Sequence, residues 1–157
     1  MAAFPSLNQE DIECIDSTLC ELLKKSEAQM ALLVEKAGYL IHQSGEPNEL
    51  DTTTFATLGS NAYNAVQFMA SLVNENNFTS MYQQGERFST LMVNVDENAL
   101  VVMVFPTHLT VGSMKYYAAP AVRAIAQRIS VATARGDTID LSDVDAVDVQ
   151  ALFHKAP

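Results

Sequence analysis

The spacing of apolar residues changes its period several times along this chain, and this succession limits the folds that it can adopt. Residues 7–25 carry leucine and isoleucine at helical spacing, with most acidic residues on the other sides. Two short apolar runs follow, residues 30–35 and residues 39–44, separated by Lys36-Ala37-Gly38. A glycine that can take positive φ between two such runs is typical of a β-hairpin. The first third therefore predicts a helix followed by a hairpin.

The rest of the chain continues this alternation. Residues 52–74 predict a long second helix, and three strands follow at about 79–84, 88–95 and 99–105. The order α-β-β-α-β-β-β-α fits an α+β domain, with an antiparallel five-stranded sheet and helices on its faces. The apolar stripe that we expect to pack the second helix against the sheet comprises Phe55, Leu58, Ala62, Ala65, Val66, Met69, Leu72 and Val73.

The ends of the helices also carry signals. Ser6 with Gln9 forms a capping-box pattern and predicts the start of the first helix. Thr110 is the predicted cap of a third helix that runs to about residue 134. Pro120 lies inside that helix, where it removes a backbone hydrogen bond, so we expect a kink there.

Charge and composition exclude several classes of function. The net charge is −10, and an acidic surface repels phosphate backbones and anionic lipid, so neither nucleic acid nor insertion into a membrane is expected. The N-terminus lacks the pattern of a secretory signal, and the longest apolar run, residues 99–105, is too short to span a bilayer. Cys14 and Cys20 lie too far apart on one helix for a disulfide. We expect a cytoplasmic protein.

The second helix gives the first functional hint, because none of its 23 residues from Thr52 to Asn74 is charged. Ordinary surface helices place Lys and Glu towards solvent, whereas the cores of protein interfaces are depleted in charge. The alternative is a helix buried within its own domain, which Asn61 and Asn64 disfavour. The face that we predict to contact a partner comprises Thr57, Ser60, Asn61, Asn64, Ala65 and Phe68.

The strand at residues 79–84 gives a second hint. It carries no charge and no proline that would protect an edge, so at the edge of the sheet it could pair with a second copy of the chain. An internal strand would explain the same residues equally well. The candidate dimer-interface residues are Phe68, Ser71, Thr79, Met81 and Gln83.

Residues 136–157 read as an acidic extension to a domain that spans residues 1–135. Ser142 could cap a short helix that begins at Asp143. A segment this short is marginal alone and suits folding on a partner, although a frayed terminus is equally compatible. The residues of its predicted binding face are Val144, Val149, Leu152 and Phe153.

Catalytic and metal-binding patterns do not emerge from the sequence. His42, His108 and His154 lack metal-ligand spacing, and the chain contains no phosphate-binding glycine loop. Neither cysteine has a neighbouring His or basic cluster that would activate a thiol. We therefore expect no catalytic residue, no metal and no cofactor.

Several segments together resemble the Roadblock/LC7 family. Residues 32–41 are similar to its first hairpin, and residues 50–58 and 84–87 resemble the start of the second helix and a turn in the MglB branch of the family. Residues 100–105 with Val111-Gly112 resemble its last strand and the start of its last helix. Residues 148–153 are similar to the acidic and hydrophobic end of MglB.

This resemblance implies a profilin-like sandwich and a homodimer whose sheet continues across both chains. It also implies a regulator of the Ras-like GTPase MglA, which orders the switch regions of the GTPase without an arginine finger, so that Arg87 and Arg123 would not be catalytic. The tail would bind the GTPase and favour nucleotide exchange. Roles in cell polarity and motility, and a position at a cell pole, follow from the same resemblance. Asn64 and Phe68 depart from the very small residues typical of that helix.

Two other classes of function remain. A dimeric scaffold or sensory module would recruit partners without changing GTP turnover. A thiol enzyme would need Cys14 or Cys20 in an activating environment that the sequence does not indicate.

Overall fold

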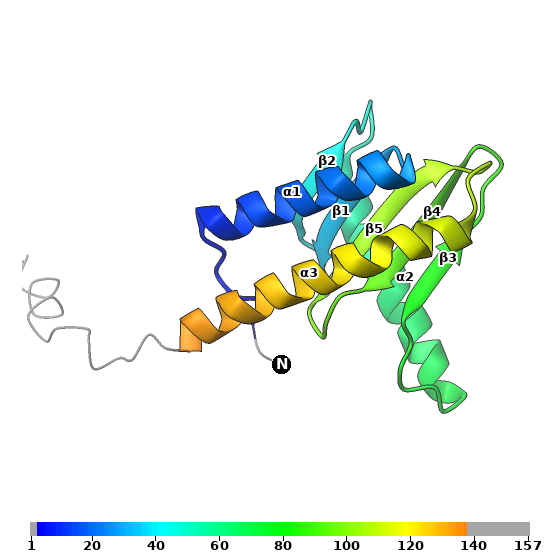
Figure 1. Ribbon diagram of the computed structural model, residues 1–157. Helices are drawn as coiled ribbons and strands as arrows, with labels where there is room; N and C mark the ends of the chain where they lie inside the picture. Colours follow the sequence, from blue (N-terminus) through cyan, green and yellow to red (C-terminus); the bar gives the residue numbers. More distant parts are fainter. Residues whose placement is uncertain (1–2, 138–157) are drawn as a thin grey trace, which may run out of the picture.

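The computed structural model describes residues 3–137, and the eight helices and strands in that range follow the predicted order (Figure 1). The fold is the predicted α+β sandwich. The elements are α1 (Gln9–Ser26), β1 (Met30–Glu35), β2 (Leu40–Gly45), α2 (Thr52–Leu72), β3 (Ser80–Gln83), β4 (Phe88–Asn94), β5 (Ala99–Pro106) and α3 (Val111–Asp137).

The five strands form one antiparallel sheet in the order β2-β1-β5-β4-β3. β1 and β5 lie at the centre, which explains their nearly continuous apolar sequences, because both of their faces are covered. The hairpin between β1 and β2 turns at Gly38, whose φ of 113° is the positive value predicted for it. β2 and β3 are the two edges of the sheet.

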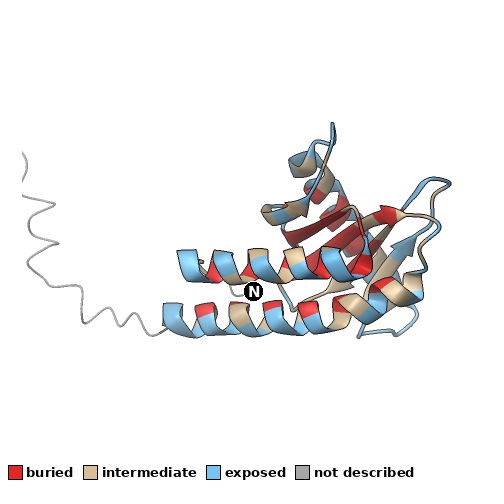
Figure 2. Cartoon of the chain, turned by 45° about the horizontal axis from the view of Figure 1, so that its top comes forward, coloured by how far each residue is buried: buried red, intermediate tan, exposed pale blue. Residues whose placement is uncertain are grey.

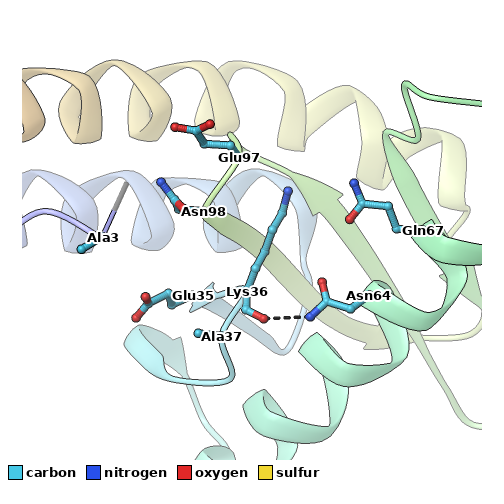
Figure 3. A pocket seen from close by; sticks show the side chains of 8 residues that line it. All are labelled: Ala3, Glu35, Lys36, Ala37, Asn64, Gln67, Glu97 and Asn98. Atoms are coloured by element: carbon cyan, nitrogen blue, oxygen red, sulfur yellow. Dashed lines mark hydrogen bonds between the residues drawn. The ribbon is translucent and has the colours of Figure 1, made fainter. Parts of the chain in front are cut away.

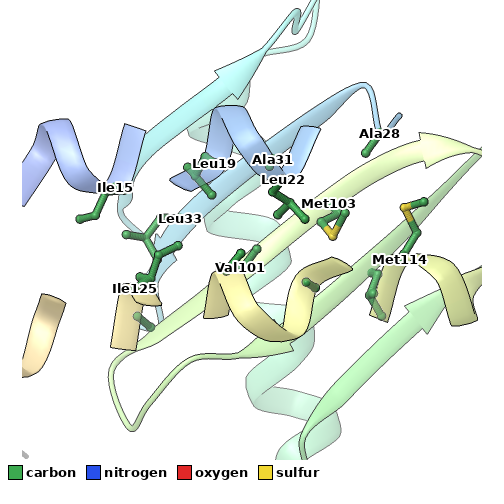
Figure 4. Packing of buried hydrophobic residues seen from close by; sticks show 14 of the residues in the cluster. Ile15, Leu19, Leu22, Ala28, Ala31, Leu33, Val101, Met103, Met114 and Ile125 are labelled. Atoms are coloured by element: carbon green, nitrogen blue, oxygen red, sulfur yellow. The ribbon is translucent and has the colours of Figure 1, made fainter. Parts of the chain in front are cut away.

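The helices lie on opposite faces of the sheet, with α1 and α3 on one side and α2 on the other (Figure 1). The larger core cluster lies under α1 and α3, where Ile15 and Ile125 meet Leu33 of β1 and Val101 of β5 (Figure 4). The buried residues of α1 and α3 also face one another (Figure 2). The smaller cluster lies under α2 and is centred on Tyr63.

The helix ends differ in part from the predictions. α1 is capped by Asn8 rather than Ser6, since Asn8 and Asp11 form the reciprocal capping box that we assigned to Ser6 and Gln9. Thr110 caps α3 as predicted, and its hydroxyl accepts a hydrogen bond from the backbone N–H of Ser113. α3 continues through Pro120 as one helix (Figure 1). Among residues 3–137, no helix is long and apolar enough to cross a bilayer.

Candidate functional site

The face of α2 that lies on the sheet combines three small residues with one large aromatic residue. Ala56, Gly59, Ser60 and Tyr63 are the buried residues of this helix. A Cβ atom at Gly59 would lie 3.2 Å from Cε of Met92 in β4, so the absence of a side chain lets the helix approach the sheet closely. The hydroxyl of Tyr63 donates to the backbone carbonyl of Phe78 at 3.2 Å, and the two rings lie 4.7 Å apart between centroids.

The opposite face of α2 is exposed and uncharged, and it carries several large apolar side chains among polar ones. The exposed large side chains are Leu58 (63%), Phe68 (69%), Met69 (64%) and Leu72 (71%), followed by Val73 (76%) just after the helix. Since the helix has no charged residue, no lysine or glutamate interrupts this surface. Monomeric proteins seldom expose a cluster of large apolar side chains such as Phe68, Met69 and Leu72, so this surface has the character of a binding interface.

This orientation corrects two predictions. We expected Leu58, Met69 and Leu72 to pack on the sheet, but they point away from it. We also expected Ser60 on the outward face, whereas it is fully buried. The remaining predicted contact residues of the helix, Thr57, Asn61, Asn64, Ala65, Phe68 and Ser71, are exposed. The sequence did hold a signal for the correct face, because Ala56, Gly59, Ser60 and Tyr63 repeat at intervals of three and four residues.

The C-terminal half of α2 extends past the sheet (Figure 1). From Gln67 to Leu72 only Ala70 is partly buried. The chain then returns to β3, which pairs with β4 on one side only. β3 is therefore an edge strand of the described sheet, and not the internal strand that the sequence left as an alternative.

The exposed strand edge carries little that would block pairing. β3 has no charged residue and no proline, and Gln83 is exposed while Met81 packs partly into the cluster under α2. Tyr82 points to the other face, where its ring stacks on Phe105 at 6.3 Å between centroids. The outer edge of β3 and the uncharged end of α2 thus both remain uncovered in the described chain.

The N-terminal half of α2 is tied to the β1–β2 turn. Thr57 donates from Oγ1 to the carbonyl of Gly38 at 3.0 Å, and Asn64 donates from Nδ2 to the carbonyl of Lys36 at 2.9 Å. These two predicted contact residues therefore also have a structural role, which fixes the turn beside the helix. Any partner that lies on this part of α2 would touch the turn as well.

A pocket of about 630 Å³ opens between this turn, the β4–β5 turn and α2 (Figure 3). The ammonium group of Lys36 lies there, 5.6 Å from the ring centroid of Tyr63. Burial lowers the pKa of Lys36, and the negative charges of Asp96 and Glu97 oppose that shift. The residues that line the pocket are Ala3, Glu35, Lys36, Ala37, Asn64, Gln67, Glu97 and Asn98.

Other polar groups have structural partners. His42 lies 2.8 Å from a carboxylate oxygen of Asp16, and Cys20 lies 3.1 Å from the hydroxyl of Ser44. No group of His, Cys, Asp and Glu side chains within residues 3–137 could hold a metal ion. Val144, Val149, Leu152 and Phe153 lie outside the described residues. The site that stands out is the surface formed by α2, β3 and the β1–β2 turn.

Several solved structures that share this fold are described as MglB. A structure described as MglB with a tetrameric arrangement is 27% identical, covers 84% of this chain and 99% of its own, and has a TM-score of 0.77. The gliding protein MglB of Thermus thermophilus is also 27% identical, with coverages of 83% and 98% and a TM-score of 0.76. Myxococcus xanthus MglB shares the fold at 24% identity and a TM-score of 0.76, with coverages of 81% and 96%.

The search of curated proteins gave no match. The family model described as the Roadblock/LC7 domain matches residues 15–105, which run from α1 to the end of the central strand β5. That match covers more than half of the sequence and agrees with the resemblance noted in its hairpin and its last strand. The chain therefore belongs to the Roadblock/LC7 family.

Proposed function

We propose that this protein is a homodimeric regulator of a Ras-like GTPase of the MglA type, and that it stimulates GTP hydrolysis by that GTPase. The observation that carries the proposal is the exposed, uncharged face of α2 beside the unpaired edge of β3, in a fold shared with MglB.

The homodimer would form through β3 and the C-terminal half of α2. Two copies of β3 could pair across a two-fold axis and extend the sheet, and the neighbouring helices would then cover each other's Phe68 and Leu72. Desolvation is cheap there because neither element carries a charge. Ser71, Thr79, Met81 and Gln83 complete the predicted interface.

The GTPase would lie on the N-terminal half of α2 and on the adjoining β1–β2 turn. Thr57, Asn61 and Asn64 offer polar contacts there, while Ala65 allows a close approach of the backbones. The hydrogen bonds from Thr57 and Asn64 to the turn hold that surface in one shape before the GTPase arrives. A preformed surface lowers the entropic cost of ordering a flexible switch segment.

Hydrolysis would be accelerated by ordering the switch regions, since phosphoryl transfer depends mostly on positioning and electrostatics. The protein would contribute no arginine to the phosphates. Arg87 precedes β4 and Arg123 lies on α3, on the other side of the sheet from α2, so neither belongs to the proposed contact surface. The tail, through Val144, Val149, Leu152 and Phe153, would bind the same GTPase and promote nucleotide exchange.

Complex formation tests the proposal against the alternative of a passive scaffold. The full-length protein is mixed with an MglA-type GTPase loaded either with GDP or with a GTP analogue that cannot be hydrolysed, and each mixture is run on a sizing column. A regulator that orders the switch regions should form a markedly more stable complex with the GTP-like form than with the GDP form. Equal binding to both forms would favour the scaffold, and no binding to either would refute the proposed partner.

A further inference from the structure

A second surface lies on the opposite side of the sheet, on the N-terminal half of α3. Two hollows flank Arg123 there, one of about 490 Å³ and one of about 350 Å³. The first is lined by Lys25, Tyr116, Tyr117, Ala119, Pro120 and Arg123. The second is lined by Thr79, Ser80, Val93, Lys115, Ala119, Val122 and Arg123. Neither hollow has an acidic lining residue, although the protein carries a net charge of −10. We refer to both hollows together as the α3 groove.

Two of the three cations in the α3 groove lack a counter-charge. Lys25 forms an exposed ion pair with Glu21 at 2.8 Å. Lys115 and Arg123 are exposed and form no ion pair with any residue between 3 and 137. The exposed ring of Tyr116 packs edge-on against Tyr117 at 5.2 Å between centroids, which adds an aromatic wall to the groove. The groove thus combines unpaired positive charge with apolar surface.

We propose that the acidic segment of this chain at residues 138–148 folds back and binds in the α3 groove. The segment follows α3 directly and carries Asp140, Asp143, Asp145 and Asp148, with no lysine or arginine. Opposite charges are segregated along the sequence, as a contact between the segment and α3 requires. No acidic residue occurs between Glu97 and Asp137, so every charged residue of α3 up to Arg135 is basic, whereas every charged residue of the segment is acidic.

The length of the segment fits the distance that it must cover. Arg123 precedes Asp137 by 14 residues, which corresponds to about 21 Å along a helix. Asp143 and Asp148 follow Asp137 by 6 and 11 residues, and these lengths reach about 20 and 36 Å when extended. Lys115 precedes Asp137 by 22 residues, or about 33 Å along the helix. Asp145 and Asp148 can therefore return to Arg123, Asp143 can do so at full extension, and Asp148 alone can reach Lys115. Because the segment is tethered, its effective concentration at the groove is on the order of millimolar, which makes weak pairs sufficient.

Binding in the α3 groove would place the start of the tail on the face away from α2. The contact rests on exposed charge pairs, so it should weaken as salt screens them. Val147, which precedes Asp148, could lie against the Tyr116 ring. This inference concerns a contact within the protein itself, and it holds or fails whether or not a GTPase is the partner.

The test uses the full-length protein labelled with ¹⁵N. The transverse relaxation rates of amides 143–148 should be about twofold higher at ~20 mM NaCl than at ~500 mM NaCl, because the segment is immobilised only at low salt. Reversing the groove charges with Lys115→Glu and Arg123→Glu should lower the low-salt rates to their high-salt values. Both residues are exposed on the helix surface, so these changes should leave the fold intact.

Matched variants separate a specific contact from a general effect of charge. The control pair Lys24→Glu and Arg87→Glu changes the net charge equally at exposed positions that do not line the groove, and it should leave the rates high. Adding Asp143→Lys and Asp145→Lys to the variant with Lys115→Glu and Arg123→Glu should restore the high relaxation rates, because the segment and the groove then attract each other again with the signs of their charges exchanged. The proposal is overturned if both charge-reversed pairs behave alike, if the exchanged charges fail to restore the rates, or if the rates of wild-type protein do not respond to salt.

Discussion

Asp11, in the first turn of α1, accepts two hydrogen bonds from the guanidinium group of Arg135, which lies 124 residues later in the last turn of α3. The two N–O distances are 2.9 and 3.1 Å. Arg128 adds a third contact at 3.3 Å, and the backbone N–H of Asn8 adds a fourth at 2.9 Å. The Asp11 side chain is fully buried. This carboxylate therefore joins the free ends of the two antiparallel helices.

We expect stability at acid pH to depend on Asp11. The hydrogen bond from Arg135 is the largest of the effects that lower the pKa of Asp11 to about 2, against an opposing effect of burial. Because the pKa is depressed in the folded state, this stabilisation is complete above the unfolded value near 4 and is lost as the pH falls towards about 2. Asp11→Asn should lower the free energy of unfolding at pH 7 by about 1.5–3 kcal/mol.

Urea denaturation at pH 7 and at several values down to about pH 2 measures both effects. The Asp11→Asn variant should lose the part of the pH dependence that lies between about 4 and 2. Glu21→Gln is the control, since Glu21 pairs with Lys25 on an exposed surface and should change stability far less. If the two variants show the same pH profile, Asp11 does not hold the helices together.

Self-association should depend on the outward face of α2. Leu72→Glu places a charge in the proposed dimer interface, while Leu72 is exposed in the single chain and contributes little to its folding. We expect the dimer to dissociate at least about tenfold more readily, as sedimentation equilibrium would measure. Val131→Glu, at an exposed position on α3, is the matched control and should leave the association constant unchanged. A monomeric wild-type protein would contradict the proposed interface.

The orientation of α2 can be tested with two neighbouring residues. Ser60 is fully buried against the sheet and Asn61 is exposed. Ser60→Leu should therefore cost about 1–3 kcal/mol of stability through overpacking, whereas Asn61→Leu should change it by less than ~0.5 kcal/mol. Thermal or urea denaturation of the two variants distinguishes this orientation from the one that the apolar stripe predicted. The reverse order of effects would mean that the helix is turned.

The tail prediction concerns residues outside the described range. Leu152→Arg combined with Phe153→Arg should weaken binding to the GTPase or slow nucleotide exchange, because it removes the apolar contacts of the proposed tail helix. Dimerisation should be unaffected. Affinity by calorimetry and exchange with a fluorescent nucleotide measure these effects, with Asn76→Arg and Asn77→Arg as a control for added positive charge. Unchanged affinity and exchange would show that the tail end makes no contact.

The order of the elements could be predicted from the sequence because local periodicity determines it. The alternation between helical spacing and short apolar runs located all eight elements, and Gly38 marked the first hairpin correctly. The boundaries moved by a few residues where two caps competed. Ser6 and Asn8 are both good capping residues, and Asn8 is selected because its partner, Asp11, is also anchored by Arg135. No local pattern could reveal a contact across 124 residues.

The orientation of α2 could not be predicted because a hydrophobic stripe does not say what covers it. We assigned Leu58, Met69 and Leu72 to the core, because the apolar stripe of a helix is expected to face the core of its own chain when no partner is considered. The sheet instead receives Ala56, Gly59 and Ser60, whose small size permits close packing, together with Tyr63. Leu58, Met69 and Leu72 remain exposed. A helix with two surfaces to cover divides its residues between its own sheet and a partner, and only the three-dimensional arrangement reveals that division.

GTP turnover by the partner tests the central claim most directly. The rate of single-turnover hydrolysis by an MglA-type GTPase is measured alone, with this protein, and with the variant Asn61→Arg, which places a bulky cation on the exposed N-terminal half of α2. Wild-type protein should raise the rate by at least about tenfold, a loss of roughly 1.4 kcal/mol from the barrier, and Asn61→Arg should abolish most of that gain. An unchanged rate with wild-type protein, at concentrations where the complex forms, would contradict the account.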